Sequence, residues 1–141
     1  MVYVRDEGLF DAPIDKVWKY VNNQEGNHRH ETIPSMRLLE QKGNVAEFEA
    51  ETKGPDGKLQ KETWKFVFNP PYGYDFEALA GPQKGTRHTH TYIPAGDKTK
   101  VIVVGDFQFQ GVTDPAQAEK MALQYLERVF NEDNATLKAL K

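Results

Sequence analysis

Hydrophobic and polar residues alternate at every second position through most of the middle of the chain. In VAEFEAET, KETWKFVF, YGYDFEAL and KVIVVGDFQF, apolar side chains occupy one set of alternate positions and mostly polar or charged side chains the other. This period is typical of strands with one covered and one wet face. Turn sequences separate the segments at hairpin spacing, namely KGN (42–44), GPDGK (54–58), NPPYG (69–73), AGPQKG (80–85) and PAGDK (94–98). The pattern from Met36 to Phe109 therefore predicts an antiparallel meander of six strands.

The segment before the meander predicts one strand and one or two short helices. YVRDEGLF reads as the strand, and APIDKVWKYVNN reads as a helix, with Pro13 in its first turn and Asp15 near its N-terminus. Its apolar stripe at helical spacing comprises Ile14, Val17, Trp18 and Val21. A second short helix over residues 24–31 is an alternative, although that segment has no apolar face.

The final segment predicts one long helix. Asp114 is placed as its N-cap, with Pro115 at the first helical position and Gln117 at the third. The apolar stripe that follows comprises Ala122, Tyr125, Leu126, Val129, Phe130, Leu137 and Leu140. A helix of about 26 residues is about 39 Å long, which is enough to cross the whole predicted sheet.

This order of elements, together with the sequence AP-x-x-x-VW at residues 12–18, resembles the START-related (SRPBCC) superfamily. That group includes birch-pollen-allergen-like proteins, polyketide cyclases and ligand-transport domains. The resemblance implies an α+β helix-grip fold, in which a bent seven-stranded antiparallel sheet wraps around the C-terminal helix. It covers essentially the whole chain, so we expect a single domain over residues 1–141. The resemblance also implies a cavity between sheet and helix for a small hydrophobic molecule such as a lipid or polyketide.

Composition narrows the function classes. The 141 residues include 38% hydrophobic and 28% charged side chains, with a formal net charge of -3. This balance gives no reason to expect nucleic acid as a partner. The chain has no cysteine, so disulfides, thiolate catalysis and cysteine metal ligands are excluded. The first residues do not resemble a signal peptide, and no apolar run predicts a membrane span, so we expect a cytoplasmic protein.

The alternation also places candidate chemistry on the covered face. In TRHTHTYI, exposed positions for Arg87, Thr89 and Thr91 put the intervening His88 and His90 inward. Aromatic side chains of the neighbouring strands share that face. The predicted ligand-binding residues are Trp64, Phe66, Tyr72, Tyr74, Phe76, His88, His90, Tyr92, Phe107, Tyr125 and Leu126. Such a lining suits a flat or partly hydrophobic molecule, although aromatic residues at these positions also serve simply to fill a core.

The histidines have three interpretations. As metal ligands, His88 and His90 project to one side of a strand, and one of His28 and His30 is the candidate third ligand, together with Glu31 as a further donor. As catalytic groups, His88 or His90 transfers protons at neutral pH. As binding groups, they hydrogen-bond to neighbours or to a ligand. The third interpretation is favoured, so no metal or other cofactor is predicted.

Three functions follow in order of preference. The first is binding of a small hydrophobic or aromatic molecule in the cavity. The second, which the resemblance implies, is a cyclase- or dehydratase-like enzyme that uses the cavity histidines, with or without a metal. The third is a protein-interaction module similar to the co-chaperone branch, for which we expect a filled interior. The sequence contains no signal for oligomeric state.

Overall fold

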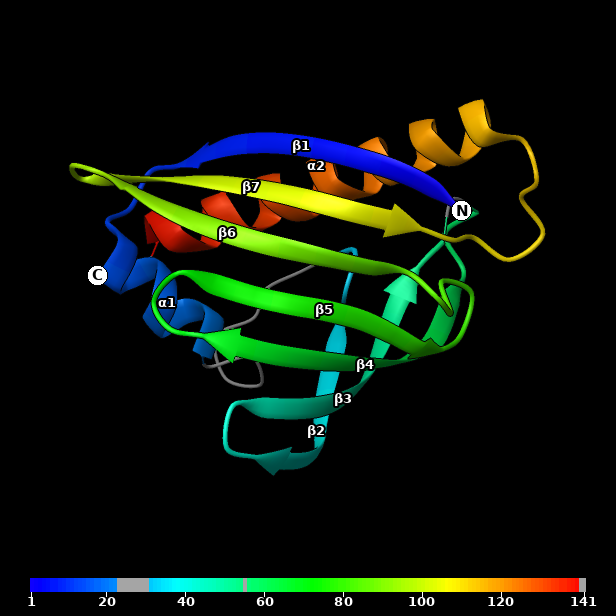
Figure 1. Ribbon diagram of the computed structural model, residues 1–141, viewed down its shortest axis with the longest axis horizontal. Helices are drawn as coiled ribbons and strands as arrows, with labels where there is room; N and C mark the ends of the chain where they lie inside the picture. The colour runs from blue at the N-terminus through cyan, green and yellow to red at the C-terminus, as the bar shows by residue number, and fades with distance from the viewer. Residues whose placement is uncertain (23–30, 55, 140–141) are drawn as a thin grey trace.

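The computed structural model describes residues 1–22, 31–54 and 56–139, and its order of elements is the predicted one. A first strand leads through a short helix to six further strands and a long helix (Figure 1). The elements are β1 (Val2–Phe10), α1 (Ile14–Asn22), β2 (Ser35–Lys42), β3 (Val45–Lys53), β4 (Leu59–Asn69), β5 (Gly73–Ala80), β6 (Arg87–Ala95), β7 (Lys98–Phe107) and α2 (Pro115–Ala139). Residues 24–30 of the alternative second helix lie outside the described part.

The seven strands form one antiparallel sheet in the order β1-β7-β6-β5-β4-β3-β2. Each of the five predicted turns joins two consecutive strands of the meander. Figure 1 shows the sheet curling, so that parts of β2 and β3 run across the direction of β5, β6 and β7. The predicted inner face is confirmed, because Phe48, Trp64 and Phe66 are buried on neighbouring strands.

The outer face of β3 and β4 carries charges that balance one another. Glu47 stands opposite Lys65 in the strand register, and Glu51 stands opposite Lys61. Opposite charges at facing positions stabilise a strand pair modestly. The row of glutamates is therefore a solvated strand face, as the alternation predicts.

The long helix α2 covers the hollow side of the sheet and passes behind β1 and β7 in Figure 1. Asp114 caps it, because its Oδ1 accepts a hydrogen bond from the backbone N–H of Ala116 at 3.1 Å. The helix approaches β1 closely at Gly8, where an added Cβ would lie 2.5 Å from the ring of Phe130. That ring stacks on Phe10 with a centroid distance of 4.8 Å. Glycine at position 8 thus leaves the space in which the helix packs against the strand.

Three consecutive residues of α2 form hydrogen bonds to separate parts of the chain that precede β2. We call these residues, 132–134, the anchor segment. Glu132 accepts hydrogen bonds from the backbone N–H of Thr32 at 3.0 Å and from its hydroxyl at 2.6 Å. Asp133 accepts one from the hydroxyl of Tyr20 in α1 at 2.6 Å. The helix is therefore tied both to α1 and to the chain leading into β2.

The third residue of the anchor segment, Asn134, joins the β1–α1 connection. Its Oδ1 accepts a hydrogen bond from the backbone N–H of Asp11 at 2.9 Å. The carboxylate of Asp11 also pairs with Lys98 at 2.7 Å and Lys138 at 3.1 Å. Hydrogen bonds from these two lysines and from Asn134 hold the pKa of Asp11 well below its usual range. The anchor segment thereby fixes the C-terminal part of α2 to the β1–α1 connection, to α1 and to the chain that leads into β2.

In the part of the chain that the structure describes, neither helix combines the length and apolar character that crossing a membrane requires.

Candidate functional site: an aromatic cavity beneath the long helix

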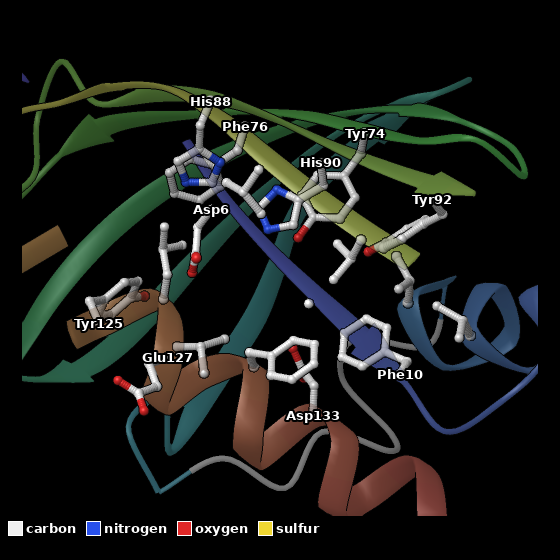
Figure 2. A pocket seen from close by; sticks show the side chains of 18 of the residues that line it. Asp6, Phe10, Tyr74, Phe76, His88, His90, Tyr92, Tyr125, Glu127 and Asp133 are labelled. Carbon is white, nitrogen blue, oxygen red and sulfur yellow. The ribbon is translucent and has the colours of Figure 1, made fainter. Parts of the chain in front are cut away.

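A cavity of about 470 Å³ lies between the inner face of the sheet, α1 and α2. Figure 2 shows side chains from strands on one side and from α2 on the other pointing into it. The structure brings together nine of the eleven predicted ligand-binding residues around this space: Trp64, Phe66, Tyr74, Phe76, His88, His90, Tyr92, Tyr125 and Leu126. The volume lies within the usual range for a small-molecule site.

Two of the predicted residues do not border the cavity. Tyr72 lies in the turn before β5, where its backbone N–H donates to the carbonyl of Asn69, and the residue is 60% exposed. The alternation predicts an inward Tyr72, but the strand begins only at Gly73. Phe107 is completely buried at the end of β7 and stacks behind His88 at a centroid distance of 5.0 Å. It supports a cavity residue without reaching the cavity.

His88 lies between two aromatic rings. It stacks on Phe76 at 4.4 Å with nearly parallel planes, while Phe107 covers its other face. The residue is 8% exposed, and its Nδ1 is buried with no hydrogen-bond partner among the described residues. Gly105 stands opposite His88 in the register of β6 and β7, and an added Cβ there would lie 2.5 Å from the Cα of His88. Aromatic stacking and this glycine therefore fix the imidazole at the wall of the cavity.

His90 is held similarly, two residues further along the same face of β6. Its ring stacks on Tyr74 at 4.4 Å and lies 4.9 Å from the ring of His88. Its Nδ1 is also buried, again with no partner in the described part of the chain. The Nε2 atoms of both rings lack described protein partners too, but they are not enclosed in the same way. They are therefore the nitrogens available to a molecule in the cavity.

Burial keeps both imidazoles neutral at physiological pH. It lowers the pKa of His88 well below its ordinary value, and the nearby His90 adds to this effect. Burial also lowers the pKa of His90 to about 4, although the negative charge of Asp133 acts in the opposite direction. A neutral imidazole offers one nitrogen as a donor and the other as an acceptor. The pair can therefore recognise polar groups of either kind without adding charge.

Tyrosine hydroxyl groups continue the polar part of the lining. Burial raises the pKa of Tyr74, Tyr92 and Tyr125 above the ordinary value for a phenol. These phenols stay protonated at physiological pH and offer both a donor and an acceptor. The cavity thus combines aromatic walls with a small number of neutral polar groups, as ligand sites commonly do.

Several cavity residues were missed in the sequence, although a signal was present. Asp6 shares the inner face of β1 with the buried Val4 and Phe10, and its carboxylate points into the cavity (Figure 2). Asp133 follows Phe130 and Leu126 at helical spacing and also lines the cavity. Tyr20, which bonds to Asp133, does so as well. An acidic residue in phase with apolar residues was the available signal.

Glu62 is another acidic residue that the sequence analysis missed although it is in phase with buried apolar residues. It alternates in phase with Trp64 on β4 and is 2% exposed. Its carboxyl group accepts hydrogen bonds from the hydroxyl of Thr52 at 2.7 Å, the indole N–H of Trp64 at 3.2 Å and the amide of Gln83 at 3.5 Å. Burial raises its pKa despite these donors. The group orients the Trp64 ring, which forms part of the cavity wall.

A second hollow of about 510 Å³ lies beyond Tyr125. It is lined mainly by polar and charged residues, such as Gln83, Gln124 and Arg128. Tyr125 and Glu127 border both spaces. The mixed polar lining distinguishes this hollow from the aromatic cavity.

Metal binding stays the less favoured interpretation of the histidines. Within residues 1–22, 31–54 and 56–139, no three histidine or acidic side chains are grouped so that they could hold an ion. The two candidates for a third ligand, His28 and His30, lie outside the described residues. His88 and His90 alone supply two nitrogens, fewer than the three protein ligands of typical catalytic zinc sites.

Comparison with solved structures identifies the same fold. A START superfamily protein from Mycobacterium smegmatis aligns with a TM-score of 0.87 and 14% identity, covering 99% of each chain. A protein from Thermus thermophilus aligns with a TM-score of 0.82 and 16% identity, covering 97% of each chain. The Zhui aromatase/cyclase from a Streptomyces species aligns with a TM-score of 0.75 and 17% identity, covering 96% of this chain and 90% of that one. At these identities the likeness shows the fold alone.

Comparison of the sequence identifies the family. No curated protein matches the chain. Residues 1–140 match a family described as polyketide cyclase / dehydrase and lipid transport. Membership supports a ligand-binding or cyclase role without distinguishing the two. With its seven-stranded sheet, its long C-terminal helix and the cavity between them, the chain belongs to this family within the START-related superfamily.

Proposed function

We propose that the protein binds a small aromatic or largely hydrophobic molecule in the cavity beneath α2. The observation that carries this proposal is the pair of stacked imidazoles at the cavity wall, whose less enclosed Nε2 atoms have no hydrogen-bond partner among the described residues. Polar groups buried without a partner are uncommon in proteins and cost free energy. A ligand that hydrogen-bonds to Nε2 of His88 or His90 supplies a partner that the described protein groups do not, while its apolar body contacts Trp64, Phe66 and Phe76.

Cyclase or dehydratase activity is the second candidate function. The available Nε2 atoms of His88 and His90 favour it, because a base must reach its substrate. The lowered pKa values count against it, because a general base works best when its pKa lies near the working pH. With a pKa of about 4, His90 accepts a proton only weakly at pH 7. Binding is therefore the better-supported function.

An interaction module without a small ligand is the least supported alternative. It predicts that side chains fill the interior, whereas about 470 Å³ lies between the sheet and α2. An open space of this size forfeits packing contacts that a purely structural core would make.

A neutral aromatic alcohol, 2-naphthalenemethanol, tests the proposal. We expect it to bind with 1:1 stoichiometry by calorimetry, because its rings match the aromatic walls and its hydroxyl can bond to an imidazole. Replacing both histidines, as H88F and H90F together, keeps the ring stacking but removes the nitrogens. We expect the double variant to bind about tenfold more weakly, since each hydrogen bond contributes about 1 kcal/mol.

The matched control is Tyr72→Phe, which removes a polar group from an exposed aromatic residue outside the cavity. It should leave the affinity unchanged. Absence of binding by the unmodified protein to the alcohol and to naphthalene analogues of other charge, all at millimolar concentration, would refute the proposal. If the unmodified protein and the histidine variant bound the alcohol equally well, His88 and His90 would not contribute to binding.

A further inference from the structure

The charged groups of the cavity are all acidic. Its described lining includes four acidic residues, Asp6, Glu7, Glu127 and Asp133, and no lysine or arginine. Two of them lie at the edge: Glu127 is exposed, and Glu7 is paired with Lys100 at 2.8 Å. Asp6 and Asp133 are half-buried, and Figure 2 shows them on opposite sides of the space.

The half-buried Asp6 has no partner for its charge among the described residues. None of the described residues forms a hydrogen bond or ion pair with its carboxylate. Its neighbours in the chain behave differently, because Arg5 and Glu7 point outward and pair with one another at 3.2 Å. Asp6 is therefore a carboxylate on the inner face of β1 whose compensating charge does not come from described protein groups.

The strand register brings Asp6 near the imidazole pair. Asp6 faces Val103 on β7, and Val103 faces His90 on β6, so the three residues form one row across adjacent strands. Neighbouring strands are about 4.8 Å apart, which puts the backbones of Asp6 and His90 about 10 Å apart. All three side chains border the cavity. A ligand lying over Val103 has a carboxylate on one side and a neutral imidazole on the other.

This arrangement discriminates between ligands by charge. An apolar ligand that displaces water from Asp6 leaves a dehydrated carboxylate without a partner, at considerable cost. An anionic ligand adds repulsion to that cost, whereas an ammonium group supplies the opposite charge. His88 and His90 stay neutral at physiological pH and do not repel a cation.

We propose that the cavity selects hydrophobic amines, with the ammonium group bound by Asp6 and the apolar body held by the aromatic walls. This inference rests on the proposed ligand-binding function and adds the charge of the ligand. It assigns Asp6 as the residue that determines specificity, and it places molecules with a free carboxylate among the poorest ligands.

Three naphthalene compounds of similar shape test the inference by calorimetry at pH 7.4: 2-naphthylmethylamine, 2-naphthalenemethanol and 2-naphthoic acid. We expect the amine to bind at least tenfold more tightly than the alcohol, and the carboxylate to bind more weakly than either. The nearly isosteric variant Asp6→Asn should bind the amine and the alcohol with similar affinity. Its affinity for the alcohol should be at least that of the unmodified protein, because an amide costs less to dehydrate than a carboxylate.

Glu119→Gln is the matched control, because it removes the same charge from an exposed position of α2 outside the cavity. It should preserve the preference for the amine. Asp6→Ser provides a second variant with the same expected result if Asp6→Asn folds poorly. Binding of the alcohol without preference for the amine, or a preference for the amine that survives the Asp6→Asn or Asp6→Ser substitution, overturns the inference but leaves the proposed function intact. Failure of all three compounds to bind refutes the proposed function itself.

Discussion

Gly105→Ala is expected to lower the free energy of unfolding by more than about 3 kcal/mol, above the usual range for an overpacked core. The added Cβ would collide with the carbonyl oxygen of Arg87 and would lie 2.5 Å from the Cα and 2.6 Å from the Cβ of His88. These atoms belong to the backbone and the base of a side chain, so rotation of a flexible group cannot relieve the collision. Strands β6 and β7 must separate at the position where His88 is held.

Urea denaturation at pH 7.5 measures this effect, and Gly54→Ala is the control. An added Cβ at Gly54 would meet only the side-chain atoms of Asp56 and Gln60, at 3.2 to 3.4 Å. We expect that control to change stability by less than about 1 kcal/mol. A Gly105→Ala protein as stable as the control would show that β6 and β7 do not approach as described.

The second large effect is a loss of stability in mild acid. The ordinary pKa of His90 is 6.5, and burial lowers it to about 4 in the native state. Between these values the unfolded chain binds a proton that the native protein excludes, so stability falls as pH decreases. Proton linkage predicts that His90 alone lowers the free energy of unfolding by about 2 kcal/mol between pH 7 and pH 5. His88 adds a loss of the same sign, because its pKa is also lowered.

Glu62 contributes with the opposite sign. Because its pKa is raised, its native carboxyl group keeps a proton at pH values where the unfolded chain has lost it. Its contribution to stability is complete below pH 4.5 and is lost as pH rises through the native pKa. The free energy of unfolding of the unmodified protein therefore depends on pH through opposing contributions. A histidine variant is needed to separate them.

His90→Phe isolates the histidine contribution. Phenylalanine retains stacking on Tyr74 but does not titrate, and Glu62 is unchanged in both proteins. Both proteins are unfolded chemically at pH 7, 6 and 5. Between pH 7 and pH 5, the free energy of unfolding of the variant should fall by about 2 kcal/mol less than that of the unmodified protein. Tyr72→Phe should follow the unmodified protein. Parallel curves for His90→Phe and the unmodified protein would mean that His90 titrates normally in the native state.

Much of the fold follows from local patterns that agree with one another. The alternation in β3, β4 and β6 predicted the inner faces, and the cap at Asp114 predicted the start of α2. The same alternation placed His88 and His90 inward. It failed at Tyr72, because that residue belongs to the turn formed with Asn69 and β5 begins only at Gly73. Period-two reasoning is thus reliable within a strand and unreliable at its boundary.

The charged residues of the interior show a different limit. Asp6, Glu62 and Asp133 each share a periodic pattern with buried apolar residues, yet charged residues are ordinarily assigned to the surface. Only the three-dimensional arrangement shows that Asp6 and His90 flank Val103 in one row. The volume of the cavity was also unpredictable, because it depends on how far the sheet curls around α2. Local sequence patterns do not encode that distance.

The anchor segment also affects how the protein forms during synthesis. Residues 132–134 follow all seven strands in the sequence. The ribosome therefore makes the sheet, α1 and the connections on either side of α1 before the residues that bind them to α2. Until α2 emerges, the aromatic inner face lacks the long helix that covers most of it. A nascent chain in this state exposes the kind of apolar surface that favours aggregation and chaperone binding. The cavity can therefore close only after the seven strands have been made, and its efficiency of closure depends on α2.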